Sequence, residues 1–232
     1  MTPLAWAVFC GVALLADWGV VAQGQELLRP ERNDGGSLIN QDYYTVDHHP
    51  ETVGLLRSVE YGHFSQPMFD SFRRGEYKAV IGDLQFTLER IANHPGALSL
   101  ISTVAMVTKM NGLPVPFFER ARALYPQYAF THAQYGYYLL EIGALDKSVE
   151  HLKEATKLDA TLPSAHAWLA EAYYKSQKMP LAKQEEGEAR KLGYTKAIPQ
   201  FEGHGQSGDR APAKGSKKKS AADLQVSKSD GQ

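Results

Sequence analysis

The sequence contains a single cysteine, Cys10, among its 232 residues. This cysteine lies within the first 22 residues, which we interpret below as a removable leader, so the mature chain contains none on this interpretation. Disulfide bonds, thiolate nucleophiles and cysteine-based metal sites are thereby excluded from the mature protein.

An excess of either charge is also lacking. Residues 23–232 carry 25 basic and 25 acidic side chains, and the body of the chain shows no basic face. Six of the basic residues lie in the tail from Gly203 onward, where no aromatic residues alternate with them. This distribution argues against nucleic-acid binding. A glycine-rich phosphate loop is missing too, because Gly35 and Gly36 do not stand between a strand and a helix.

Long apolar runs are scarce as well. The N-terminal run, residues 4–16, spans 13 uncharged residues, whereas a membrane-spanning helix needs about 20. Val20-Val21-Ala22 follows, which predicts a signal peptide that is cleaved after Ala22. Because Met1-Thr2-Pro3 contains no Lys or Arg, an uncleaved membrane anchor is the alternative.

What the sequence does contain is an internal repeat. Alanine and leucine recur at a fixed 34-residue interval in two series, Ala121, Ala155 and Ala189, and Leu124, Leu158 and Leu192. The same interval joins Tyr135 to Leu169 and Gly136 to Ala170. Each unit has a small residue where two helices must approach closely and larger apolar residues at helical spacing. A period of this length predicts stacked helix-turn-helix units.

This pattern resembles the tetratricopeptide repeat family, and in particular its exported bacterial members. One unit carries the family motif at His132, Tyr135-Gly136, Leu139, Ser148, Leu152 and Ala155. The next carries it at Trp168, Leu169-Ala170, Tyr173, Ala182, Glu186 and Ala189, with the tryptophan displaced by two positions. The resemblance implies an all-α fold, a right-handed helical-hairpin solenoid of about three to four units.

The repeat frame and the composition together divide the chain into four parts. We expect a signal peptide at 1–22, a linker and short N-terminal helix at 23–64, the repeat domain at 65–200 and a disordered basic tail at 201–232. Within the second part, Tyr43–Val46 has extended character, and a helix is predicted from Glu51 to Tyr61. The last repeat helix is rich in charge, which predicts a polar end cap where Glu186 faces water.

In the family that the chain resembles, the first helix of each unit lines a concave groove. The corresponding positions are Ser99, Thr103, Met106, Phe130, Ala133, Tyr137, Glu141, Ser164, Ala167, Glu171, Tyr174 and Lys175. This groove is aromatic and lacks the Lys, Asn and Arg set with which some family members clamp a peptide carboxylate. The resemblance thus implies contact with an extended or helical partner through aromatic side chains. For each residue the alternative is packing against the neighbouring helix.

Candidate catalytic and metal-binding residues are few. Asp47, His48 and His49, with His63 nearby, are competent metal ligands, but adjacent histidines in an extended segment point to opposite sides. We therefore expect no cofactor and no metal site, and keep metal binding at Asp47, His48 and His49 as the less favoured alternative. The remaining histidines of the repeats are predicted to pack at positions 132 and 166 and to be exposed at position 151.

These observations favour a noncatalytic scaffold or assembly adaptor in the bacterial cell envelope. We expect it to be exported, either periplasmic or extracellular, with retention as a membrane-anchored assembly factor as the alternative. The partner is expected to be another protein or peptide, a component of an envelope complex, and not nucleic acid. The tail cluster Lys217, Lys218 and Lys219 offers a weak membrane-surface contact, with a solubilising role as the alternative.

Overall fold

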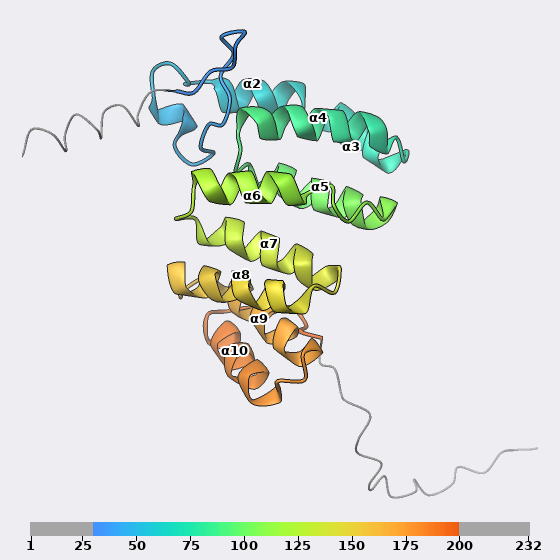
Figure 1. Cartoon of the computed structure of the whole chain (residues 1–232), viewed down its shortest axis with the longest axis vertical. Helices are drawn as coiled ribbons and strands as arrows, with labels where there is room; N and C mark the ends of the chain where they lie inside the picture. Colours follow the sequence, from blue (N-terminus) through green and yellow to red (C-terminus); the bar gives the residue numbers. More distant parts are fainter. Residues whose placement is uncertain (1–29, 200–232) are drawn as a thin grey trace, which may run out of the picture. The chain divides into compact units, whose positions relative to one another are not determined.

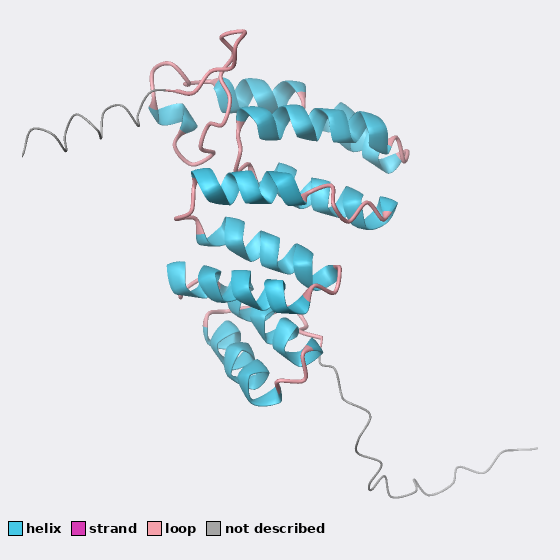
Figure 2. Ribbon diagram, in the orientation of Figure 1, coloured by secondary structure: helices cyan, strands magenta, loops and turns pink. Residues whose placement is uncertain are grey.

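The computed structural model describes residues 30–199. Those residues form a 3-10 helix, η1 (Val46–His48), and the α-helices α2 (Leu55–Gly62), α3 (Gln66–Arg73), α4 (Tyr77–Arg90), α5 (Pro95–Thr108), α6 (Val115–Leu124), α7 (Ala129–Glu141), α8 (Leu145–Leu158), α9 (Pro163–Lys175) and α10 (Met179–Lys191) (Figures 1 and 2). The all-α solenoid predicted from the sequence is therefore confirmed. The predicted leader and the predicted basic tail lie outside the described residues, and the four boundaries stay predictions.

The helices form successive hairpins, α3 with α4, α5 with α6, α7 with α8 and α9 with α10 (Figure 1). The first helices of the last three hairpins follow one another in space, because α5 packs on α7 and α7 packs on α9. A side chain at one face of α5 therefore has a counterpart one repeat later on α7. This arrangement brings one face of three helices into a common surface.

The turn that ends each first helix shows the repeat most clearly. Residues 75, 109, 143 and 177 follow α3, α5, α7 and α9, and each has a left-handed backbone, with φ of 77°, 59°, 80° and 58°. Successive members of this set are one repeat apart in the sequence. Two of them are glycines and the others are Lys109 and Gln177. The α3–α4 hairpin thus keeps the repeat geometry, although its sequence follows the motif only imperfectly.

Two clusters of buried side chains form the core. The first lies between α3 and α7 and includes the ring stack of Phe118 on Tyr135, whose centroids are 4.8 Å apart. The second joins α7 to α10. Gly136 lies so close to α8 that a Cβ on it would be 2.6 Å from Leu152 Cγ. The small residue predicted at this helix crossing is therefore required by Leu152.

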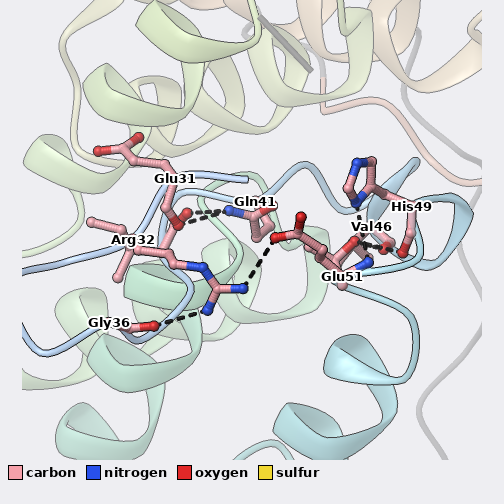
Figure 3. Close-up of polar contacts among 9 residues, drawn as sticks. Glu31, Arg32, Gly36, Gln41, Val46, His49 and Glu51 are labelled. Atoms are coloured by element: carbon pink, nitrogen blue, oxygen red, sulfur yellow. Dashed lines mark hydrogen bonds and ion pairs between the residues drawn. The ribbon is translucent and has the colours of Figure 1, made fainter. Parts of the chain in front are cut away.

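The segment before the first hairpin is held by its own polar contacts. Arg32 donates from Nη1 to the Gly36 carbonyl at 2.9 Å and from Nη2 to Glu51 Oε2 at 3.2 Å, while Gln41 donates to the Glu31 carbonyl at 3.3 Å (Figure 3). These bonds close the chain between residues 31 and 51 into a small folded loop. The segment is therefore ordered, although its composition is typical of a linker.

Asp42 fastens this loop to the repeats. Its Oδ1 accepts a hydrogen bond from Asn93 Nδ2 at 2.7 Å, and its Oδ2 accepts one from the Tyr128 hydroxyl at 2.5 Å. Asn93 in turn accepts from the Tyr43 amide at 2.7 Å. The N-terminal segment therefore packs on the turns that lead into α5 and α7.

Two local predictions for this segment were wrong. Tyr43–Val46 is not extended, because the Asp42 side chain accepts from the Tyr44 amide at 3.1 Å and starts a turn into η1. The helix expected from Glu51 begins only at Leu55, since Gly54 before it has φ of 82°. Within residues 30–199, no helix has the length and apolar character needed to cross a membrane.

Candidate partner-binding groove

The common surface of α5, α7 and α9 is built by side chains at helical spacing. From α5 come Ser99, Thr103 and Met106, from α7 Phe130, Gln134, Tyr137 and Glu141, and from α9 Ser164, Ala167, Trp168, Glu171 and Lys175. Steps of three and four residues keep each set on one side of its helix. We call this surface the groove.

Two hollows lie along the groove. The larger has a volume of about 740 Å³ and is bordered by α7, α9 and the segment after α10. The smaller has a volume of about 150 Å³ and lies mainly between α5 and α7. We call them the charged hollow and the aromatic pocket, after the side chains described below.

Tyr137 and Trp168 border both hollows. Their ring centroids are 4.7 Å apart with an interplanar angle of 30°, and both side chains are half-buried. Burial and the nearby carboxylates of Glu141 and Glu171 raise the pKa of Tyr137. This ring pair is the central aromatic feature of the groove, because it separates the two hollows and contacts both.

The charged hollow takes its name from an ion-pair network on its floor. Lys175 Nζ lies 3.0 Å from Glu171 Oε1 and 3.7 Å from Glu141 Oε1. Lys196, on the segment after α10, also borders the hollow. Two acids and two bases therefore share this surface, and Lys175 forms ion pairs with both carboxylates.

The segment Tyr194–Pro199 forms the far wall of the charged hollow. The chain turns after α10 at Gly193, where φ is 88°, and Arg190 Nη1 donates to the carbonyls of Tyr194 and Lys196 at 2.8 and 2.7 Å. Ile198 is buried in the second core cluster. An extended segment thus lies against α9 where a further repeat would place its first helix.

Most of the predicted groove residues border one of the two hollows, and two do not. Tyr174 is only 2 % exposed, and its hydroxyl donates to Glu186 Oε2 on α10 at 2.6 Å, so the prediction that it offers a free aromatic surface was wrong. Burial and this hydrogen bond raise the pKa of Tyr174 to about 12. Ala133 is fully buried between helices and borders neither hollow. Whether the other residues bind a partner stays a prediction.

The end cap also differs from expectation. Glu186 does not simply face water, because it accepts the hydrogen bond from Tyr174 and lies 3.5 Å from Arg190. His151 was predicted to be exposed and is buried, because its ring packs on Tyr135 with centroids 4.5 Å apart. The packing roles predicted for His132 and His166 are confirmed by their burial.

The residues considered for a metal site bond to other groups. Asp47 Oδ1 accepts from the Gly54 amide at 3.0 Å, and His49 Nδ1 accepts from the Glu51 amide at 3.2 Å. His63 Nδ1 lies 2.9 Å from Asp83 Oδ1 on α4. Between residues 30 and 199, no three His, Cys, Asp or Glu side chains are grouped to hold a metal ion.

Sequence reasoning missed Gln134, Trp168 and the segment after α10 as components of the groove. Trp168 was assigned only to the repeat motif, although its spacing of four residues from Ser164 and three from Glu171 places it on the same helix face. The segment that carries Tyr194 and Ile198 was not predicted to form a wall of the groove. No local pattern indicates that wall, because it depends on how the chain turns at Gly193.

The architecture defines a class of protein, a short array of helical hairpins with one concave surface. The family model described as TPR repeat matches residues 136–177, from Gly136 in α7 to Gln177 after α9. This part of the chain therefore resembles a tetratricopeptide repeat, as its 34-residue spacing predicts. Repeats of this type serve as noncatalytic interaction modules, so binding of another protein or peptide is the role that the matched region suggests.

Solved structures with a similar arrangement include residues 41 to the end of MamA from Desulfovibrio magneticus RS-1, at 18% identity over 61% of this chain and 80% of that chain, with a TM-score of 0.45. Another is YrrB, described as a TPR protein with an unusual peptide-binding site, at 17% identity over 62% and 74%, with a TM-score of 0.44. No curated protein matches the chain. Similarities of this size concern helical architecture and carry no information about partners.

Proposed function

We propose that this protein is an assembly adaptor of the bacterial cell envelope that binds an extended or helical segment of a partner protein in its groove. The observation that carries this proposal is the Tyr137–Trp168 ring pair, half-buried at the junction of the two hollows. Aromatic side chains supply a large contact area at a low entropic cost, and they dominate many binding interfaces.

The groove is tested by Tyr137→Ala in the full chain. We expect this substitution to weaken capture of the native partner by about tenfold or more, because it removes a central aromatic contact. Helix content should be unchanged by circular dichroism. The matched control is Tyr61→Ala, which removes an aromatic side chain that is 87 % exposed on α2 and outside the groove. Equal capture by both variants and the unmodified chain would overturn the proposal. Tyr174 is not used, since its buried hydroxyl contributes to folding.

The envelope location rests on the sequence of residues 1–22, which lie outside the described part of the chain. Mass spectrometry of the mature N terminus separates export with cleavage from retention as a membrane-anchored factor. A chain that begins at Gln23 supports export, whereas an intact Met1 supports the anchored alternative. The proposed weak membrane contact of Lys217–Lys219 is tested by vesicle binding with and without anionic lipid.

A further inference from the structure

The aromatic pocket differs from the rest of the groove in its chemistry. Side chains from α5, α6, α7 and α9 line it, and none of them is acidic or basic. Its walls include the rings of Phe130, Tyr137 and Trp168 together with the thioether of Met106. Methionine adapts its shape to apolar neighbours of different form. The walls are therefore suited to an apolar group.

Three of the hydroxyl groups that line this pocket have acceptors, while Gln134 Oε1 is buried without a protein hydrogen-bond partner. Ser102 donates to the Leu98 carbonyl at 2.8 Å, Thr103 to the Ser99 carbonyl at 3.0 Å, and Tyr138 to the Asn111 carbonyl at 2.7 Å. Burial raises the pKa of Tyr138. A charged group here would lose its hydration and gain no opposite charge in return.

The size of the pocket fits one side chain. A single water molecule needs about 10–15 Å³ on the same measure, so a volume of about 150 Å³ exceeds the room for one water by about tenfold. A helix does not fit into this volume, whereas one aromatic or branched aliphatic side chain does.

The charged hollow beyond the ring pair offers the opposite chemistry. Glu141, Glu171, Lys175 and Lys196 provide acceptors and donors of both signs around about 740 Å³. A polar peptide backbone and neutral polar side chains can hydrogen-bond to such a surface without upsetting its charge balance. The groove is thus divided at Tyr137 and Trp168 into an uncharged part and a polar part.

We propose that the partner is a peptide segment with one large, neutral apolar side chain, phenylalanine-like in size, which enters the aromatic pocket while the adjoining polar residues lie over the charged hollow. This inference rests on the proposed function and adds the chemistry of the partner. It follows from the uncharged walls and the volume of the pocket.

The test uses three small probes on the full chain: N-acetyl-phenylalanine amide, N-acetyl-lysine amide and N-acetyl-glutamate amide. Their affinities are measured by saturation-transfer NMR titration. We expect the phenylalanine probe to bind at least about tenfold more tightly than either charged probe. Equal affinities of the three probes, or no binding of the phenylalanine probe, would overturn the inference.

Two substitutions locate the binding. Thr103→Trp places an indole in the pocket. We expect it to lower the affinity for the phenylalanine probe by at least about tenfold. Thr156→Trp, on α8 and outside both hollows, is the matched control, for which the affinity should be retained. Ser99→Trp fills the same pocket from an exposed position, so it serves if Thr103→Trp does not fold. Binding that survives both tryptophan variants contradicts the assignment to this pocket.

Two other occupants give distinct results. If Thr103→Trp converts a dimer into a monomer in light scattering, a second copy of this chain occupies the pocket and the inference is wrong. If Phe201→Ala strengthens probe binding, the chain's own residues occupy it, and the inference is again wrong. If the probes do not bind but Tyr137→Ala still weakens capture of the native partner, this inference is wrong. The proposed function then stands.

Discussion

The hairpins α7–α8 and α9–α10 share one backbone plan, but they differ at positions that correspond to each other after a shift of one repeat. In the first, Leu152 is fully buried and presses against Gly136. In the second, the equivalents are Glu186 and Ala170, and the carboxylate accepts a hydrogen bond from Tyr174. The α7–α8 hairpin therefore needs a glycine beside the branched side chain of Leu152. The α9–α10 hairpin has the unbranched Glu186 at that place and tolerates the methyl group of an alanine.

The same two hairpins differ in how a buried histidine is paired. His166 Nδ1 lies 2.7 Å from Glu185 Oε2, and its Nε2 lies 3.0 Å from the Ala160 carbonyl. Its counterpart His132 has Nε2 at 3.2 Å from the Pro126 carbonyl, and its Nδ1 is buried without a protein hydrogen-bond partner. The counterpart of Glu185 is His151, whose ring centroid is 6.0 Å from that of His132. A carboxylate faces one histidine, and a second imidazole faces the other.

The charged groups around His132 and His151 come from two helices. Arg122 and Glu119 lie on α6, while Glu150 and Glu154 lie on α8. Burial lowers the pKa of His132 and of His151, and the positive charge of Arg122 lowers both further. The α7–α8 hairpin is therefore built for neutral imidazoles, while the α9–α10 hairpin supplies a carboxylate.

The largest effect is expected from exchanging the small residues. Gly136→Ala places a Cβ 2.6 Å from Leu152 Cγ and 3.1 Å from the Leu152 amide nitrogen, which should lower the free energy of unfolding by about 1–3 kcal/mol. The reverse change, Ala170→Gly, should lower it by only about 0.5–1 kcal/mol through backbone entropy. Urea unfolding measures both. If the two variants lose equal stability, the close contact with Leu152 is not what distinguishes the hairpins.

The turns give a smaller effect of opposite sign. Gln177 ends α9 at φ of 58°, where the α7–α8 hairpin has Gly143 at φ of 80°. A residue with a side chain pays a steric cost in the left-handed backbone conformation, and Gln177→Gly removes this cost. The substitution should raise the unfolding free energy by about 1 kcal/mol. Gly143→Gln is the matched reversal and should lower it by about the same amount. A destabilised Gln177→Gly variant would show that the glutamine side chain contributes more than its backbone costs.

The smallest effect concerns acid. Because the folded-state pKa values of His132 and His151 are lowered, the unfolded chain binds protons first as the pH falls below about 6.5. The stability that these neutral histidines contribute is therefore complete above that pH and is lost progressively below it. His151→Glu places a carboxylate opposite His132. It should reduce the loss of unfolding free energy between pH 7.5 and 5.5, which the midpoints of urea unfolding measure. Glu185→His should enlarge this loss of stability. If neither variant changes the pH dependence of stability, the different histidine partners of the two hairpins have no effect on it.

The 34-residue spacing predicted the fold because its determinants are local. Alanines such as Ala121 and Ala155 mark helix crossings that each repeat forms anew, and the turn at Gly143 follows the same frame. The order of the N-terminal loop could not be predicted, because Asp42 bonds to Asn93 and Tyr128, which are 51 and 86 residues away. Such contacts leave no periodic signal in one sequence.

The groove was predicted in part for the same reason. Tyr137 and Glu171 occupy the same place in successive repeats, so the frame placed both on the groove surface. Tyr174 was misplaced because it lies off that face: its counterpart one repeat earlier, Leu140, is also buried, at 1 % exposed. The repeat frame therefore assigns Tyr174 to the core and not to the groove.

The extended segment after α10 limits how copies of this molecule can join. Solenoids that leave a bare terminal helix face present the same surface at every copy, and head-to-tail contacts of this kind propagate into open filaments. Here Ile198 and the Arg190 bonds to the Tyr194 and Lys196 carbonyls hold a strip of chain against α9. Contact between copies through this part of α9 therefore requires displacement of that strip.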